Sequence, residues 1–252
     1  MSDRPIPDFP NALKDLGWSD LPGGEAERVA EITREFVEAS LAFGDVEPAV
    51  TIFGSARLTE SHPAYALARE TARLLALEGF NVVTGGGPGI MEAANRGCRE
   101  GGGVSIGLNI RLPHEQHANA YLDREFNFTY FFIRKYMFLK LSCAFIAFLG
   151  GYGTLDELFE MLTLMQTRKI ESYPIIMGGK DVEDALEPLL GKLLEHGTIS
   201  IEDRNLIHRS ANPEDAVKLV VEHHRRLSQV TNKPETKPSR LHGELRPRLP
   251  KP

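Results

Sequence analysis

Two glycine-rich turns are the part of this sequence best suited to holding an anion. The first is TGGGPG at residues 84–89, and the second is GGYGT at residues 150–154. Each turn follows an apolar run typical of a buried strand and precedes a helical pattern. Glycine lets the backbone approach a ligand closely, and the N–H groups at the start of a helix attract negative charge. Two turns of this kind predict one phosphate-containing ligand, held along one edge of a parallel sheet.

Four residues are candidates for contact with that phosphate. Three of them lie in the first turn, and the fourth lies at the end of the strand expected over residues 49–54, at the same edge of the sheet. They are Gly86, Gly87, Gly89 and Ser55.

Neither turn has the sequence of a common cofactor site. A dinucleotide-binding turn, G-x-G-x-x-G, would need a third glycine where this chain has Glu92 or Asp156. A Walker turn would end in Gly-Lys followed by Ser or Thr, and neither turn does. His114 and His117 stand in a polar segment with no third ligand evident, which argues against a metal site. We therefore expect no cofactor and no metal.

The composition favours a small-molecule partner. The chain has 252 residues, of which 42% are hydrophobic, and a formal net charge of −6. Net negative charge argues against a nucleic-acid partner, and a membrane partner is not expected because the chain lacks a run of about 18 apolar residues. The first ten residues are polar and interrupted by prolines, so we expect no secretory leader and a cytoplasmic location.

Strand-like and helix-like segments alternate from residue 49 onward, which is typical of an α/β fold. Strands are expected at residues 49–54, 80–84, 104–110, 144–149 and 174–177. Helices are expected at residues 64–78, 90–100, 129–141, 182–195 and 213–227 and from residue 155 onward, and residues 112–127 are expected to form a long polar loop. The pattern predicts a Rossmann-like, doubly wound, mostly parallel sheet in a single domain with an N-terminal helical extension.

The predicted boundaries divide the chain into three parts. Residues 1–48 form the extension, with one helix over residues 25–42, and residues 49–228 form the Rossmann-like domain. Residues 229–252 are rich in proline and basic residues and lack a periodic apolar face, so a disordered tail is expected there.

Three short motifs together resemble a known enzyme family. They are GGGPGIME at residues 85–92, the pair Arg134-Lys135, and GGYGTLDE at residues 150–157. On these motifs the chain resembles the LONELY GUY family, which has often been labelled lysine decarboxylase. The resemblance implies a homo-oligomeric phosphoribohydrolase that cuts the N-glycosidic bond of cytokinin nucleoside 5′-monophosphates, releasing the free base and ribose 5-phosphate. One departure is Leu149, where the family usually has proline.

The same resemblance assigns roles to individual residues. It makes Arg134 and Glu157 the catalytic pair. It also implies a set of residues that line the nucleotide: Glu115, Lys135, Gly151, Tyr152, Gly153, Thr154, Leu155, Asp156 and Thr163. These assignments suit the chemistry, because breaking an N-glycosidic bond creates positive charge on the sugar, and a nearby carboxylate stabilises such charge. Glu157 is expected in the first turn of the helix that holds the phosphate.

The residues themselves leave other interpretations open. Residues 154–157 also fit a capping box, in which Glu157 would bond the backbone at the start of the helix. Arg134 and Lys135 also fit an ordinary solvated pair. Two alternative functions are a general AMP or nucleoside 5′-monophosphate nucleosidase and a non-catalytic carrier of a nucleotide-like cofactor. Lysine decarboxylation is the least supported, because nothing singles out Lys135 or Lys140 to hold pyridoxal phosphate.

Overall fold

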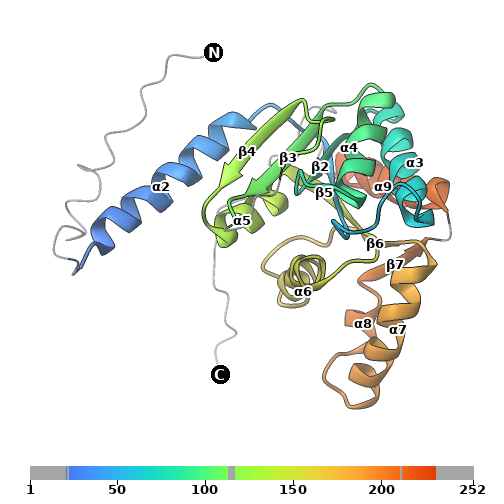
Figure 1. Ribbon diagram of the computed structural model, residues 1–252. Coiled ribbons are helices and arrows are strands. Elements are labelled where there is room, and N and C mark those ends of the chain that lie inside the picture. The colour runs from blue at the N-terminus through green and yellow to red at the C-terminus, as the bar shows by residue number, and fades with distance from the viewer. Residues whose placement is uncertain (1–20, 22, 113–116, 211, 231–252) are drawn as a thin grey trace.

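The structure is a computed structural model that describes residues 21, 23–112, 117–210 and 212–230. Its centre is one parallel sheet of seven strands in the order β4-β3-β2-β1-β5-β6-β7 (Figure 1). The strands are β1 (Ala49–Phe53), β2 (Asn81–Thr84), β3 (Ser105–Ile110), β4 (Arg124–Phe128), β5 (Ser142–Ala147), β6 (Ile175–Gly178) and β7 (Ile207–Ser210). The helices are α2 (Glu25–Ala42), α3 (Pro63–Leu77), α4 (Ile90–Glu100), α5 (Phe131–Leu141), α6 (Tyr152–Gln166), α7 (Lys180–Glu195), α8 (Ile201–Arg204) and α9 (Pro213–Val230).

The sheet is doubly wound, as predicted. The chain adds β2, β3 and β4 on one side of β1, and then returns to the other side of β1 to add β5, β6 and β7. The order therefore reverses between β1 and β5. In open α/β sheets, the crevice outside the carboxyl ends of the strands at such a reversal is the usual place for a ligand.

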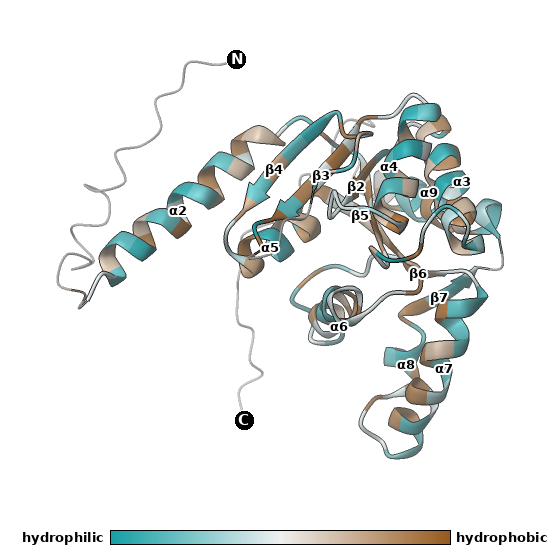
Figure 2. Cartoon of the chain, viewed as in Figure 1, coloured by the Kyte–Doolittle hydropathy of each residue, from teal (hydrophilic) through white to brown (hydrophobic). Residues whose placement is uncertain are grey.

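Helices cover both faces of the sheet, which explains the nearly continuous apolar runs of the central strands. Phe53 of β1 and Phe145 of β5 stack at a centroid distance of 6.1 Å in the core beneath α5 and α6. Their neighbours Ile52 and Ile146 point to the opposite face, into the core beneath α3, α4 and α9. Figure 2 shows the same pattern, with hydrophobic central strands under helices that mix hydrophobic and hydrophilic residues.

The predicted N-terminal helix forms and packs on the core next to α5. Phe36 of α2 lies against Tyr136 of α5, with ring centroids 4.9 Å apart. Glu35 accepts hydrogen bonds from the backbone N–H groups of Thr129 (2.8 Å) and Tyr130 (3.2 Å), immediately before α5 begins. Helix α2 therefore satisfies donors at the start of α5 that no helical carbonyl reaches.

Part of the predicted loop over residues 112–127 is wrong, because β4 begins at Arg124. Strand β4 is an edge strand in which only alternate side chains turn inward, and Phe126 and Phe128 pack on the core. The polar residues between them obscured the strand in the sequence.

Two further elements, α8 and β7, were not predicted. Helix α8 has only four residues, and β7 lacks an apolar run because its two central residues, His208 and Arg209, are polar and exposed. Helix α9 extends to Val230, beyond the predicted domain boundary at residue 228. The rest of the predicted tail, residues 231–252, lies outside the described residues. Of the helices that the structure describes, none is long and apolar enough to span a membrane.

Candidate active site

The two glycine turns meet at the carboxyl edge of the sheet, and the backbone of Ser55 connects them. Ser55 follows β1 and donates its N–H to the carbonyl of Leu149, just before the second turn, at 3.1 Å. The carbonyl of Ser55 accepts a hydrogen bond from the N–H of Ile90, just after the first turn, at 3.0 Å. Ser55 therefore lies between the two turns, at the predicted edge and at the reversal between β1 and β5.

Two glycines of the first turn cannot be replaced without moving the backbone. Gly86 and Gly89 have φ angles of +72° and +69°, a region that other residues rarely adopt. A Cβ atom on Gly89 would lie 2.4 Å from the carbonyl oxygen of Ser55, and one on Gly86 would lie 1.9 Å from Oδ1 of Asn109. The N–H groups of Gly87 and Gly89 enter no hydrogen bond among the described residues. These donors, next to the start of α4, suit an anion.

The second turn opens directly into α6, which begins at Tyr152 after the N-cap residue Gly151. Because the N-cap residue is a glycine, it has no side chain to bond the first N–H groups of the helix. The first N–H groups of α6 have no partner within the helix. Gly151, Tyr152 and Gly153 are exposed there, so their backbone is accessible to a ligand.

The capping-box interpretation of residues 154–157 is wrong. The helix begins two residues before Thr154, so Thr154 lies inside α6 and packs against Gly150, where a Cβ atom would be 2.1 Å from its Oγ1. Glu157 consequently lies in the second turn of the helix rather than the first, and its carboxylate bonds a side chain instead of the backbone.

That partner is Arg134, from α5. Nη2 of Arg134 donates to Oε1 of Glu157 at 2.6 Å, and both side chains are only 11% exposed. The guanidinium also lies 5.2 Å from the ring centroid of Phe138, and a Cβ atom on Gly85 would be 3.4 Å from its Nη2. Arg134 therefore joins α6 to the first glycine turn, and the interpretation of Arg134 as a solvated side chain is wrong.

Burial governs the electrostatics of this pair. It raises the pKa of Glu157 above the ordinary value for glutamate, and the positive charges of Arg134 and Lys135 only partly oppose that effect. On Arg134, the Nε atom is buried and has no hydrogen-bond partner among the described residues. A buried donor without a partner is costly, so this atom is suited to an acceptor on a bound ligand.

Lys135, the next residue of α5, also forms ion pairs with α6. Its Nζ lies 3.3 Å from Asp156 and 3.0 Å from Glu160, both on α6. Burial lowers the pKa of Lys135, but the hydrogen bonds and charges of Glu160 and Asp156 outweigh it and raise the pKa overall. Lys135 therefore stays positively charged near the start of α6.

The other predicted nucleotide-binding residues are not all gathered at this edge. Leu155 packs partly on the core. Thr163 lies about 17 Å along α6 from Tyr152 at 1.5 Å per residue, and its hydroxyl bonds the carbonyl of Phe159. Glu115 lies outside the described residues. His114 does as well, and no group of three His, Cys, Asp or Glu in the described part of the chain is arranged to hold a metal.

Sequence reasoning missed Asn119, which lies in the segment before β4. Its side-chain amide contacts the carbonyls of Gly86 and Gly87 in the first turn. The only signal was its place in a polar segment, and that signal does not distinguish it from its neighbours.

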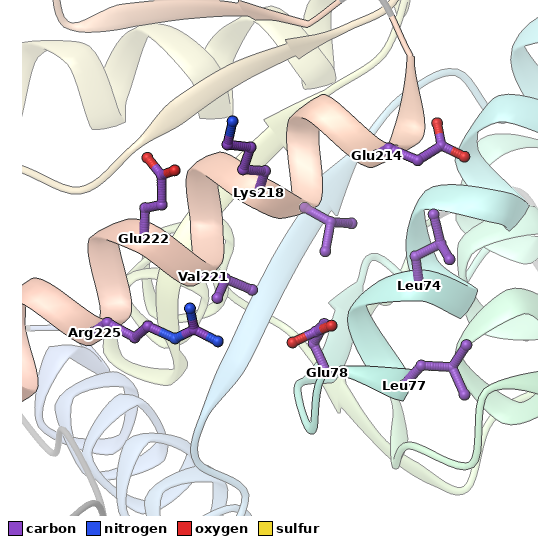
Figure 3. A pocket seen from close by; sticks show the side chains of 9 residues that line it. Leu74, Leu77, Glu78, Glu214, Lys218, Val221, Glu222 and Arg225 are labelled. Carbon is purple, nitrogen blue, oxygen red and sulfur yellow. The ribbon is translucent and has the colours of Figure 1, made fainter.

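A groove of about 470 Å³ lies elsewhere, between α3 and α9 (Figure 3). Its apolar lining includes Leu74, Val217 and Val221, and charged residues such as Glu78 and Arg225 line it as well. Glu78 ends α3 just before β2 begins, so the groove reaches the amino ends of the strands, opposite the glycine turns. Among the described residues that line it, none is a predicted site residue.

Comparison with known proteins places this geometry in context. A family model described as possible lysine decarboxylase matches residues 91–220, just over half of the chain. A probable cytokinin riboside 5′-monophosphate phosphoribohydrolase of Oryza sativa subsp. japonica is 33% identical over 141 residues, which cover 54% of this chain and 56% of that protein. A cytokinin riboside 5′-monophosphate phosphoribohydrolase of Arabidopsis thaliana is 30% identical over 159 residues, covering 59% of this chain and 70% of that protein.

Solved structures share the fold at lower identity. The molybdenum cofactor binding protein of Rippkaea orientalis aligns with a TM-score of 0.52 and 23% identity over 69% of this chain and 96% of that one. The Moco carrier protein of Chlamydomonas rheinhardtii aligns with a TM-score of 0.51 and 21% identity over 70% of this chain and 96% of that one. At this identity, the likeness shows a common fold.

Proposed function

Because the chain belongs to the LONELY GUY family, whose model is described as possible lysine decarboxylase, we propose that it hydrolyses the N-glycosidic bond of nucleoside 5′-monophosphates. The products are the free base and ribose 5-phosphate. The observation that carries this proposal is the buried pair of Arg134 and Glu157, which lies between two turns suited to a phosphate.

The turns and the pair have separate tasks in this reaction. The 5′-phosphate binds the backbone N–H groups of the first turn and of the start of α6. Glu157 is five residues further along α6 than Tyr152, a rise of about 7.5 Å, so a nucleotide anchored at the turn has its ribose near the carboxylate. Lys135 adds positive charge at the same helix end.

Glu157 acts on the attacking water. The bond between C1′ and the base nitrogen breaks while the water oxygen bonds C1′, and the Glu157 carboxylate accepts the water proton. The departing base takes up a proton from solvent, and Glu157 then returns its proton to solvent. The negative charge of Glu157 also stabilises the positive charge that develops on the ribose. Arg134 holds the carboxylate in place and favours its ionised form despite burial.

We further propose cytokinin riboside 5′-monophosphates as the first substrates to test, since the relatives from rice and Arabidopsis are named for them. A general nucleoside 5′-monophosphate nucleosidase would use AMP equally well. The purified protein is incubated, without added metal, with AMP and with isopentenyladenosine 5′-monophosphate, and base and ribose 5-phosphate are separated by chromatography. Preference for the second substrate supports the narrower activity.

The matched controls are two Glu→Gln variants. Glu157→Gln keeps an acceptor for Arg134 but removes the charge, and we expect base release to fall by roughly a hundredfold or more. Glu187→Gln alters a second Arg–Glu pair, with Arg204, on α7 and α8, and base release should be unchanged. Equal loss in both variants would count against a catalytic role for Glu157.

A second candidate function is a carrier of a nucleotide-like cofactor. It is favoured by the fold that this chain shares with a protein named as a molybdenum cofactor binding protein and with one named as a Moco carrier protein. A carrier would use the phosphate-binding turns but would not need the buried pair of Arg134 and Glu157. Tight binding of nucleotides without base release by the unmodified protein would favour the carrier.

We also propose that the chain forms a homo-oligomer. Phe131 and Phe132, at the start of α5, are 53% and 55% exposed, and large exposed aromatic side chains are common at protein interfaces. Light scattering on the purified protein measures the mass directly, and a monomer would contradict this prediction.

A further inference from the structure

Asn119 makes an unusually complete set of hydrogen bonds beneath the first glycine turn. Its Nδ2 donates to the carbonyls of Gly86 (3.1 Å) and Gly87 (3.0 Å) and lies 2.9 Å from Oδ1 of Asn95. Its backbone N–H also donates to the carbonyl of Gly86, at 2.9 Å. One residue thus binds two successive carbonyls of the turn.

Buried partners fix the orientation of this amide. Asn95, on α4, is fully buried, and its Oδ1 also accepts a hydrogen bond from the Thr84 hydroxyl at 2.7 Å. Nδ2 of Asn95 donates to Ser105 Oγ at 2.8 Å, so its Oδ1 must face Asn119. The Asn119 nitrogen therefore faces three acceptors, while its own Oδ1 accepts the N–H of Tyr121 at 3.0 Å.

The planarity of the peptide bond links these bonds to the ligand. The carbonyl of Gly86 and the N–H of Gly87 belong to one trans peptide and point in opposite directions. Holding the Gly86 carbonyl toward Asn119 therefore turns the Gly87 N–H away from Asn119. That N–H enters no hydrogen bond among the described residues. Gly86, with φ +72°, has no side chain that would prevent this peptide from flipping.

We propose that Asn119 is a positioning residue that keeps the Gly87 N–H directed at the 5′-phosphate of the bound nucleotide. This inference rests on the proposed function for the identity of the ligand. Asn119 itself does not touch the reacting atoms, and its effect is on phosphate affinity. The turn is thus aligned by a side chain from a segment more than thirty residues later in the sequence.

The test is Asn119→Asp, which preserves shape but replaces the donor with a carboxylate facing three oxygens. Calorimetry measures the affinity for ribose 5-phosphate, and for adenosine as a ligand without phosphate. We expect affinity for ribose 5-phosphate to fall by roughly tenfold or more, as for a lost buried hydrogen bond, and affinity for adenosine to stay within about twofold. Asn119→Ser, which keeps one donor, should show an intermediate loss and serves if the aspartate variant does not fold.

Asn81→Asp is the matched control. Asn81 also bridges backbone groups, donating to the carbonyl of Val46 at 2.7 Å and accepting from the N–H of Val104 at 2.9 Å, but it lies at the start of β2, away from the turn. It should lower the melting temperature without changing ribose 5-phosphate affinity. Unchanged ribose 5-phosphate affinity in both Asn119 variants, or equal loss for adenosine, would overturn the inference. Because binding needs no turnover, failure of the proposed function shows separately, as absence of base release by the unmodified protein.

Discussion

The proposed mechanism makes the pH dependence of base release a direct probe of the Arg134–Glu157 pair. The rate follows the fraction of Glu157 that is ionised, so the acidic limb of the profile reports the pKa of this carboxyl group. Burial raises that pKa, and Arg134 opposes the rise. Arg134→Gln removes the positive charge while keeping an amide donor. The neutral acid is then favoured, and the acidic limb moves to higher pH.

The size of the displacement follows from the geometry. Arg134 Nη2 and Glu157 Oε1 are 2.6 Å apart, and both side chains are 11% exposed. Charges about 4 Å apart attract by roughly 4 kcal/mol at an effective dielectric constant of about 20, which is about three pH units at 1.36 kcal/mol per unit. Water that enters the space left by the guanidinium reduces this value. A displacement of about one to three pH units is therefore expected.

The assay measures kcat/KM for base release across the acidic and neutral range. Lys135→Gln is the control, because Lys135 lowers the pKa of Glu157 less than Arg134 does, and its acidic limb should move less. A limb that stays in place in Arg134→Gln, or that moves to lower pH, would refute the assignment of Glu157 as the titrating group. If the acidic limb moved equally in both variants, Arg134 would not be the main positive charge that lowers the pKa of Glu157.

Three further predictions concern stability. Because the pKa of Glu157 is raised, the folded protein keeps the Glu157 proton to higher pH than the unfolded chain does. The resulting contribution to stability is present below the ordinary glutamate pKa and is lost as pH rises through the raised value. Glu157→Gln should remove this part of the pH dependence of the unfolding free energy, measured by urea unfolding at several pH values. Gly89→Ala places a Cβ atom 2.4 Å from a carbonyl oxygen at φ +69° and should lower the free energy of unfolding by about 1–3 kcal/mol. Gly102→Ala, at φ +83° but in open space, should lower it by about 1–2 kcal/mol. Similar melting temperatures together with intact ribose 5-phosphate binding in both variants would contradict a special role for the first glycine turn. The double variant Arg134→Met with Glu157→Leu should be at least as stable as the unmodified protein, because replacing a buried ion pair with apolar groups is often neutral or stabilising. It should lack base release. If urea unfolding shows that the free energy of unfolding falls by several kcal/mol, the pair has a structural role.

The central half of the sheet was predictable because its signal is local. Residues of β1 and β5 are buried on both faces, so their sequences are continuous apolar runs, and glycines mark where each strand ends. The edge strand β4 alternates polar and apolar residues, and the edge strand β7 exposes two polar residues at its centre, so neither gives a continuous apolar run. Edge elements depend on pairing with a neighbouring strand, which a short window of sequence does not contain.

The candidate site also has parts that could be predicted from local sequence and parts that could not. The glycine turns are local motifs, and their meeting at one edge follows from parallel strand order. Residues 154–157 fit a capping box and an active-site carboxylate equally well, and only the start of α6 at Tyr152 decides against the cap. The bond between Arg134 and Glu157 spans 23 positions, and that between Asn119 and Gly86 spans 33. Such pairs arise from the fold as a whole.

The cost of the buried pair is the strongest physical argument for an enzyme over a carrier. Taking Arg134 and Glu157 out of water is unfavourable, and the hydrogen bond between them leaves the buried Nε of Arg134 without a partner among the described residues. A binding protein that used only the two turns could have two apolar residues of similar size at these positions, and the desolvation penalty would then be absent. Catalysis supplies a reason to retain it, because a carboxylate that is buried, held by a guanidinium and raised in pKa is suited to exchanging a proton with water. We therefore propose that chemistry at the carboxyl edge of the sheet, rather than the stability of the fold, accounts for this pair.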